Sequence, residues 1–206
     1  MYMPGKKIPA DRTIKPFPAY SVKFKDVFDF KEFYTALKEW MLEYGWGDIE
    51  EGKDHWETYY AERVAIDGSK EIWARWRLAR NPSDAKFLKY YLDLDYHCLG
   101  LGPAEIVVEG RKMKVNKGEV EVSVNGVIEE IYKEKFDENP ILKEVKLLFA
   151  KRIYNKIIEQ RKKEFYHEAY ELQNYMKQWF KLKRYLPYEE NKSFFPSYSW
   201  PSHLKE

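Results

Sequence analysis

The segment of the sequence best able to do chemistry is Asp93-Leu94-Asp95-Tyr96-His97. Alternate residues of a β-strand share a face, so the two carboxylates and the imidazole would project together, each about 7 Å from the next. Such a set can bind a divalent cation or share a proton. A solvated strand face is the simpler interpretation, because antiparallel sheets routinely carry charges on their open side. We therefore expect no catalytic residue, no metal site and no cofactor, and a protein that is not an enzyme.

The motifs of common catalytic and cofactor sites are missing from the sequence. It contains no GxxxxGK[ST] or GxGxxG loop, no HExxH and no GxSxG, and its four histidines are scattered. Cys98 is the only cysteine, which excludes an intramolecular disulfide and a cysteine zinc site. No apolar run reaches the roughly 20 residues of a membrane span, and the first residues lack the apolar core of a signal peptide. These features favour the reducing cytoplasm or a virion, without secretion by a signal peptide.

Basic and aromatic residues alternate along the predicted strands and raise the question of nucleic acid. These residues are Arg63, Arg75, Arg77 and Lys89, interleaved with Tyr59, Trp73 and Tyr91. Such a sheet face can stack bases, but acidic residues share the same strands and cross-strand ion pairs explain the pattern more simply. The net charge of +2 is uneven, with basic ends around an acidic middle. That distribution indicates an anionic partner or self-association, or simply lysine-rich helices.

The clearest element in the sequence is a helix over residues 29–44. Asp29 can cap it and Glu32 can complete a capping box, while Phe28 and Phe33 can form a hydrophobic staple. Apolar residues follow at helical spacing, and Gly45 stands where the helix should end.

Period-two alternation predicts strands, first over residues 20–25 and then from about residue 54 to 132. Short turns between them indicate an antiparallel meander of about six to seven strands with one buried face. The segments 100–103 and 116–118 look like breaks or turns, with two short strands flanking residues 109–110. Asn125-Gly126, by contrast, looks like a glycine inside one long strand, because Ile128 keeps the same phase.

A second helix is predicted from Pro140 to Leu186, at about 1.5 Å per residue some 70 Å long. That length exceeds the width of a domain of this size. Either the helix bends near residues 159–164, or its second half projects past the sheet and leaves an apolar stripe that needs a partner chain.

The predicted fold class is α+β, with one N-terminal helix, the meander sheet and the long C-terminal helix in a single domain over residues 20–186. This order of elements is similar to the helix-grip arrangement, in which a curved sheet wraps the last helix. That resemblance implies a ligand cavity between sheet and helix, here lined by Trp76, Leu92, Leu94 and Val122. Residues as large as these could equally fill the space.

Two proline-rich, extended arms flank this domain, over residues 1–19 and 187–206. Disordered linkers are usually poor in aromatic residues, so the rings in these arms indicate docking, either on another subunit or on the chain's own sheet. We expect a protein interface made by Phe17, Met176, Trp179, Phe194, Phe195, Tyr198 and Trp200.

The function that follows is a non-enzymatic structural or interaction protein, a subunit of a virus particle or another multi-subunit complex. Its partners would be other protein subunits, with a homo-oligomer or a large assembly expected. Two alternatives stay open: a helix-grip-like module that binds an apolar small molecule, and an RNA- or ribosome-associated factor that uses the basic ends.

Overall fold

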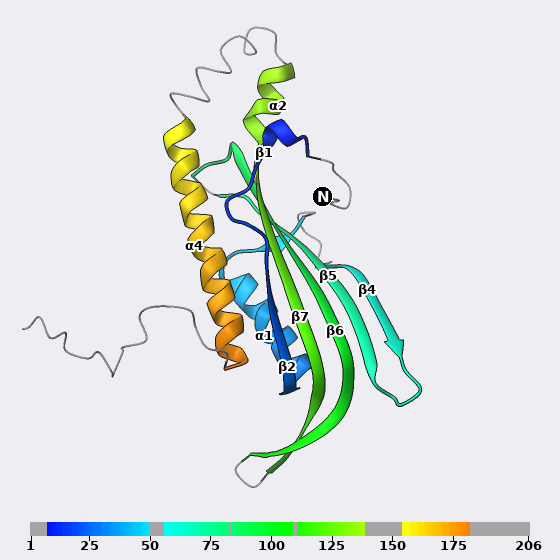
Figure 1. The fold of residues 1–206 in the computed structure, drawn as a ribbon. Helices are drawn as coiled ribbons and strands as arrows, with labels where there is room; N and C mark the ends of the chain where they lie inside the picture. The colour runs from blue at the N-terminus through cyan, green and yellow to red at the C-terminus, as the bar shows by residue number, and fades with distance from the viewer. Residues whose placement is uncertain (1–7, 50–55, 83, 109–110, 139–153, 182–206) are drawn as a thin grey trace, which may run out of the picture.

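The computed structural model describes residues 8–49, 56–82, 84–108, 111–138 and 154–181 of the chain. Within these ranges the protein is α+β, with a curled antiparallel sheet of seven strands and three helices (Figure 1). The fold class and the antiparallel sheet are those that the sequence predicts. A short 3₁₀ turn, Ala10–Arg12, precedes the first strand. No helix in the described part of the chain is long and apolar enough to cross a membrane.

The centre of the sheet consists of four strands that lie side by side in the order β2, β7, β6, β5. Their bounds are Tyr20–Phe28 (β2), Arg111–Glu130 (β7), Leu88–Val108 (β6) and Lys70–Arg80 (β5). Three shorter strands lie along the two edges of the sheet. They are β1 (Thr13–Ile14), which pairs with β7, and β3 (Gly47–Asp48) and β4 (Glu57–Val64), which both pair with β5. All of these pairs are antiparallel, so each long strand can alternate between a buried and an open face.

The breaks predicted at residues 100–103 and 116–118 are wrong, because β6 and β7 run through both segments as single strands. The register between them shifts once, between Leu99 and Gly102, and Gly100 has a φ of +63°. A Cβ atom on Gly118 would lie 2.8 Å from the carbonyl oxygen of Gly100. These glycines therefore form a bulge and a close backbone approach, not turns. The prediction that β7 continues through Gly126 is confirmed.

Helix α1, Phe30–Glu43, confirms the predicted first helix. The Asp29 carboxylate accepts a hydrogen bond from the backbone N–H of Glu32 at 2.9 Å, and Gly45 follows the helix with a φ of +73°. Both ends of α1 are therefore capped as the sequence indicates. Its buried face consists of Phe33, Leu37, Trp40 and Met41.

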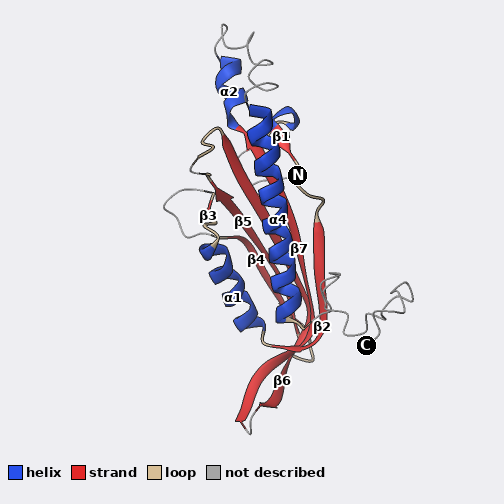
Figure 2. Cartoon of the chain, turned by 90° about the vertical axis from the view of Figure 1, so that its left-hand side faces the viewer, coloured by secondary structure: helices blue, strands red, loops and turns tan. Residues whose placement is uncertain are grey.

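Helix α4, Asn155–Trp179, lies lengthwise on the same face of the sheet as α1 (Figure 2). Its buried stripe, which faces the sheet, consists of Ile158, Phe165, Ala169, Leu172 and Met176. Of the two alternatives for the last helix, the one in which its second half projects from the sheet is therefore wrong. Residues 139–153, the first part of that predicted helix, lie outside the described residues.

Helix α2, Ile131–Glu138, follows β7 directly and was not expected. The backbone N–H groups of Ile131 and Tyr132 both donate to the carbonyl oxygen of Phe87, in the segment before β6. A contact between distant parts of the chain thus helps to place the start of this helix. Local periodicity carries no signal for such a contact.

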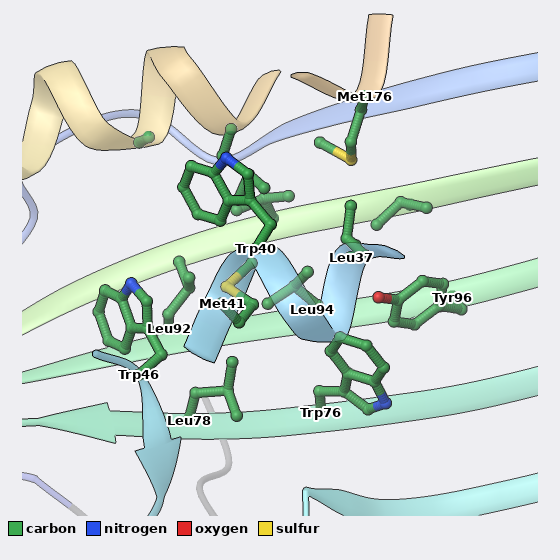
Figure 3. Packing of buried hydrophobic residues seen from close by; sticks show 14 of the residues in the cluster. Leu37, Trp40, Met41, Trp46, Trp76, Leu78, Leu92, Leu94, Tyr96 and Met176 are labelled. Carbon is green, nitrogen blue, oxygen red and sulfur yellow. The ribbon is translucent and has the colours of Figure 1, made fainter. Parts of the chain in front are cut away.

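The core lies between the two helices and the face of the sheet that they cover, here called the inner face. Trp76 packs edge-on against Tyr34 and Tyr96, with ring centroids 4.6 and 5.0 Å away (Figure 3). Leu92, Leu94 and the other residues expected to line a ligand cavity are at most 2% exposed and belong to one buried cluster. These side chains therefore fill the space in which the helix-grip resemblance placed a ligand.

The packing on Gly126 gives the first testable prediction. A Cβ atom there would lie 2.5 Å from Cζ of Phe17 and 3.0 Å from Cζ of Phe165, both buried rings. We expect Gly126→Ala to lower the free energy of unfolding by about 1–3 kcal/mol, because the rings must move. Gly47→Ala is the control, since no atom lies within 4 Å of its Cβ position. Equal unfolding midpoints for the two variants in chemical denaturation would contradict this packing.

Candidate interaction surfaces

The acidic residues of the predicted site lie on the open face of the sheet, opposite the inner face, and pair with arginines of the neighbouring strand. Arg77 and Asp93 are directly opposite in the β5–β6 register, as are Arg75 and Asp95. The Arg77 guanidinium lies 3.4 Å from the Asp93 carboxylate and 2.8 Å from that of Asp95. Arg75 lies 3.6 Å from Asp95. These distances describe a cross-strand ion-pair network.

His97 takes no part in that network. Its Nε2 atom lies 3.1 Å from the Glu71 carboxylate, and its ring stacks on Trp73 with 5.4 Å between centroids and 13° between planes. Glu71 also pairs with Arg63. Within the described residues, no group of three or more histidine, cysteine or acidic side chains is placed to hold a metal ion.

Asp93 is the unusual member of the open face, because it is only 5% exposed. Burial raises the pKa of its carboxyl from the ordinary value of 3.8 to about 6, while the Arg77 cation acts in the opposite direction. Desolvation disfavours the charged carboxylate, and here it outweighs the attraction of the arginine. This raised pKa follows from the burial of a carboxylate in a structural ion-pair network, so it does not by itself indicate catalysis.

A shallow hollow of about 640 Å³ lies on the open face over this network. Its lining includes Tyr59, Trp73, Arg75, His97 and Glu121. The Arg75 guanidinium lies over the Tyr59 ring, 5.3 Å from its centroid. The basic groups of the hollow are therefore already engaged by acidic or aromatic neighbours, as the ion-pair interpretation of the sequence expects.

A second depression, the aromatic cleft, lies where α4 ends and has a volume of about 550 Å³. Phe24 and Phe180 stack in it, with 4.5 Å between ring centroids and 15° between planes. One side of the cleft is formed by β6 after Leu101 and by β7 before Asn116. Among the described strands, these two segments pair only with each other. Its lining consists of Phe24, Asp26, Val27, Phe28, Asp29, Glu32, Ile106, Met113, Val115, Trp179, Phe180 and Lys181. It therefore combines aromatic walls with three carboxylates.

The third surface is the outer side of β4, here called the β4 edge. β4 pairs with β5 on one side, and within the described residues no strand pairs with its other side. Tyr60 and Val64 are 52% and 58% exposed, and Ile66 in the turn that follows is fully exposed. An exposed edge with apolar side chains is a template for pairing with another strand.

The structure separates the residues that were predicted to form a protein interface. Phe17 and Met176 lie in the core of their own domain, where Phe17 packs edge-on against Phe165 at 5.4 Å, and they are not available to a partner. Trp179 lies in the wall of the aromatic cleft. Phe194, Phe195, Tyr198 and Trp200 lie outside the described residues.

For Phe17 the sequence-based prediction missed which of its two alternatives holds, because the arm docks here on the chain's own sheet. β1 pairs with β7 and so brings the N-terminal arm back onto its own sheet. The signal that could have revealed this is Gly126, a glycine in the interior of a strand, since such residues often mark a close approach by another group. The β4 edge was also missed, because alternation identifies a strand but not its neighbours.

A scan of protein-family models, a search of curated proteins and a search of solved structures each found no match for this chain. Its three described surfaces differ in chemistry. The hollow is lined by ion-paired groups beside aromatic rings, the aromatic cleft is lined by aromatic and aliphatic side chains with three carboxylates, and the β4 edge offers strand backbone with exposed apolar side chains.

The buried Asp93 gives a prediction about pH. Its raised pKa means that the folded protein holds this proton more tightly than the unfolded chain, so stability falls as pH rises from about 4 to 6. Asp93→Asn removes this dependence. We expect the variant to gain roughly 2–3 kcal/mol relative to the parent between about pH 4 and pH 7.

Urea unfolding across this pH range measures the difference, and Asp67→Asn is its control. Hydrogen bonds from Ser69 lower the pKa of Asp67, so that variant should lose stability relative to the parent as pH rises. The same slope for Asp93→Asn and the parent would show that Asp93 is not held in a desolvated site.

Proposed function

We propose that this protein is a non-enzymatic interaction protein, a subunit of a larger assembly held by its terminal arms. The observation that carries this proposal is the aromatic cleft, whose lining includes Trp179, Phe180 and Lys181 at the end of α4. The sequence that continues from there contains the four aromatic residues Phe194, Phe195, Tyr198 and Trp200. We infer that the tail of one subunit, residues 187–206, docks in the aromatic cleft of another.

Two kinds of complementarity support this contact. Aromatic side chains of the tail match the aromatic walls, since aromatic pairs contribute about 0.5–1.5 kcal/mol beyond their buried area. The carboxylates of Asp26, Asp29 and Glu32 lie in the cleft, and the segment that leads into the tail contributes Lys183 and Arg184, while residues 187–206 themselves carry two lysines and three glutamates. Opposite charges at the margin of an interface favour the correct partner and speed association.

We also infer that the arrangement of α4 on a curled sheet is of the helix-grip type, used here without an internal ligand. The space between sheet and helix is occupied by Trp76, Leu92, Leu94 and their neighbours, and this weighs against the alternative of an apolar small molecule. The ion pairs of Arg75, Arg77 and Arg63 weigh against nucleic-acid binding on the open face, whereas the alternative of an RNA-associated factor depends on the basic ends and stays a prediction.

The mass of the protein in solution tests the proposed function. We expect the full chain to form species larger than a dimer of the 24.9 kDa subunit, and a chain that ends at residue 186 to form none. Light scattering measures both masses, and the circular dichroism spectrum of the shortened chain establishes that it is folded. A full chain that stays at one or two copies up to high micromolar concentration would overturn the proposal.

A pair of variants locates the contact within the full chain. Met113 lines the aromatic cleft, and Met113→Glu adds a carboxylate beside the three acidic residues there. We expect this variant to assemble at a concentration at least about tenfold higher, a loss of about 1.4 kcal/mol. Val107→Glu is the matched control, because Val107 is exposed on the same pair of strands but does not line the cleft. If the two variants assemble equally well, the cleft is not the docking site.

A further inference from the structure

The β4 edge carries backbone hydrogen-bonding groups that are not used within the described residues. In the turn after β4, the N–H of Ala65 donates to the carbonyl oxygen of Ser69 at 2.8 Å, so residue 65 points its backbone groups toward β5. Successive residues of a strand alternate in this direction. The backbone groups of Tyr60, Glu62 and Val64 therefore point away from β5, toward the free side.

We propose that a second copy of this chain pairs with this edge, β4 against β4 and antiparallel, about a two-fold axis at Ala61. The two seven-stranded sheets would then form one continuous sheet. This inference deepens the proposed function by naming the partner at one surface, and it rests on that proposal only in treating the chain as a subunit.

The two-fold axis of such a pair is perpendicular to the sheet, so the open faces of the two copies lie on the same side of the combined sheet. In an antiparallel pair, residues directly opposite each other have their side chains on the same face of the sheet. The two-fold axis must therefore pass through a residue position and not between two residues. Centred on Ala61, the register places Tyr59 opposite Arg63 and Tyr60 opposite Glu62. A guanidinium over a tyrosine ring and a hydroxyl beside a carboxylate are both favourable pairs, and each occurs twice.

Contacts within the single chain show the same chemistry. The Tyr60 hydroxyl donates to the Glu62 carboxylate at 2.9 Å, and Tyr59 already lies under the guanidinium of Arg75. The side chain of Arg63 pairs with Glu71 on β5, yet most of it remains exposed and can reach a tyrosine across the edge. The Ala61 register thus extends interactions that these groups already make.

The neighbouring registers are worse. A centre at Glu62 puts the two Glu62 carboxylates opposite each other, and like charges directly opposite are destabilising. A centre at Tyr60 puts Arg63 opposite Glu57, but a register shift between Glu57 and Tyr59 interrupts the strand there. Only the register centred on Ala61 keeps its paired residues within the regular part of β4 and separates like charges.

The backbone agrees with this register. Tyr60 and Glu62, which both present their N–H and C=O groups to the free side, come to lie directly opposite and can exchange two hydrogen bonds. Ala61 then faces Ala61 of the second copy as a pair without hydrogen bonds, with Cα atoms about 4.5 Å apart. That separation lies within the range that a disulfide can bridge.

Disulfide cross-linking of Ala61→Cys in the full chain tests the inference. We expect mild oxidation at micromolar concentration to give a dimer of twice 24.9 kDa on a non-reducing gel, in good yield. The native Cys98 is fully buried, and burial raises the pKa of its thiol to about 12, so it contributes little background. Ser123→Cys, exposed on the open face away from the edge, is the control. No dimer from Ala61→Cys, or equal yields from both variants, would overturn the pairing.

A pair of surface substitutions that should not disturb the fold gives a second test of the strand pairing. Val64 is exposed on the paired segment, and a lysine there blocks an edge strand in the way natural sheets do. In the Ala61→Cys background, Val64→Lys should reduce the cross-linked yield at least tenfold. Ile66→Lys, in the turn beyond the paired segment, should leave it unchanged. Equal yields in these two variants would mean that the strands do not pair along their length.

The outcomes separate this inference from the proposed function. If Ala61→Cys fails to cross-link while removal of residues 187–206 still reduces the mass, the β4 pairing is wrong and the tail contact stands. If the cross-link forms while the same truncation leaves the mass unchanged, the tail contact is wrong and the β4 pairing stands.

Discussion

The structure depends on one buried ring, Phe165, at the centre of α4. It contacts aromatic rings from three other parts of the chain, with centroids 5.4 Å from Phe17, 5.4 Å from Trp46 and 5.2 Å from Tyr90. Its edge rests against Gly126, the one position in this contact that has no side chain. The N-terminal arm, the segment after α1, the sheet and the last helix are thus held at a single point. Close packing of this kind transmits any change in volume to all of them.

The apolar inner face determines which side of the sheet carries most of the charged side chains. With that face filled, most charged residues of the long strands occupy the open face, where arginines of β5 face carboxylates of β6, while Arg80 at the end of β5 pairs with Glu168 of α4. Part of the open face is covered as well, by a small cluster in which Ile8 and Ile49 pack against Ala79, Tyr91 and Val127. The two surfaces that we propose as contact sites are at the margins of the sheet. One is the end where α4 stops, and the other is the side along β4.

The fold could be predicted in outline but not at its junctions. The cap at Asp29 and the alternation over residues 88–98 are local signals, and helix α1 and this part of β6 form as expected. The turn predicted at Gly118 is wrong, because a glycine needed for close backbone approach looks the same in a sequence as one needed for a turn. The start of α2 depends on a hydrogen bond to Phe87, a residue distant in the sequence, and no local pattern contains that information.

The sequence by itself determined most of the secondary structure, the apolar face of α1 and of the long strands, and the absence of any familiar catalytic motif, because these follow from local spacing and residue type. The tertiary structure decided which neighbours each face meets. It placed Phe17 in the core and Trp179 in an open cleft, although both are large apolar residues in predicted contact segments. It also left one side of β4 without a neighbour in the described chain, since the order of strands in a sheet depends on long-range pairing.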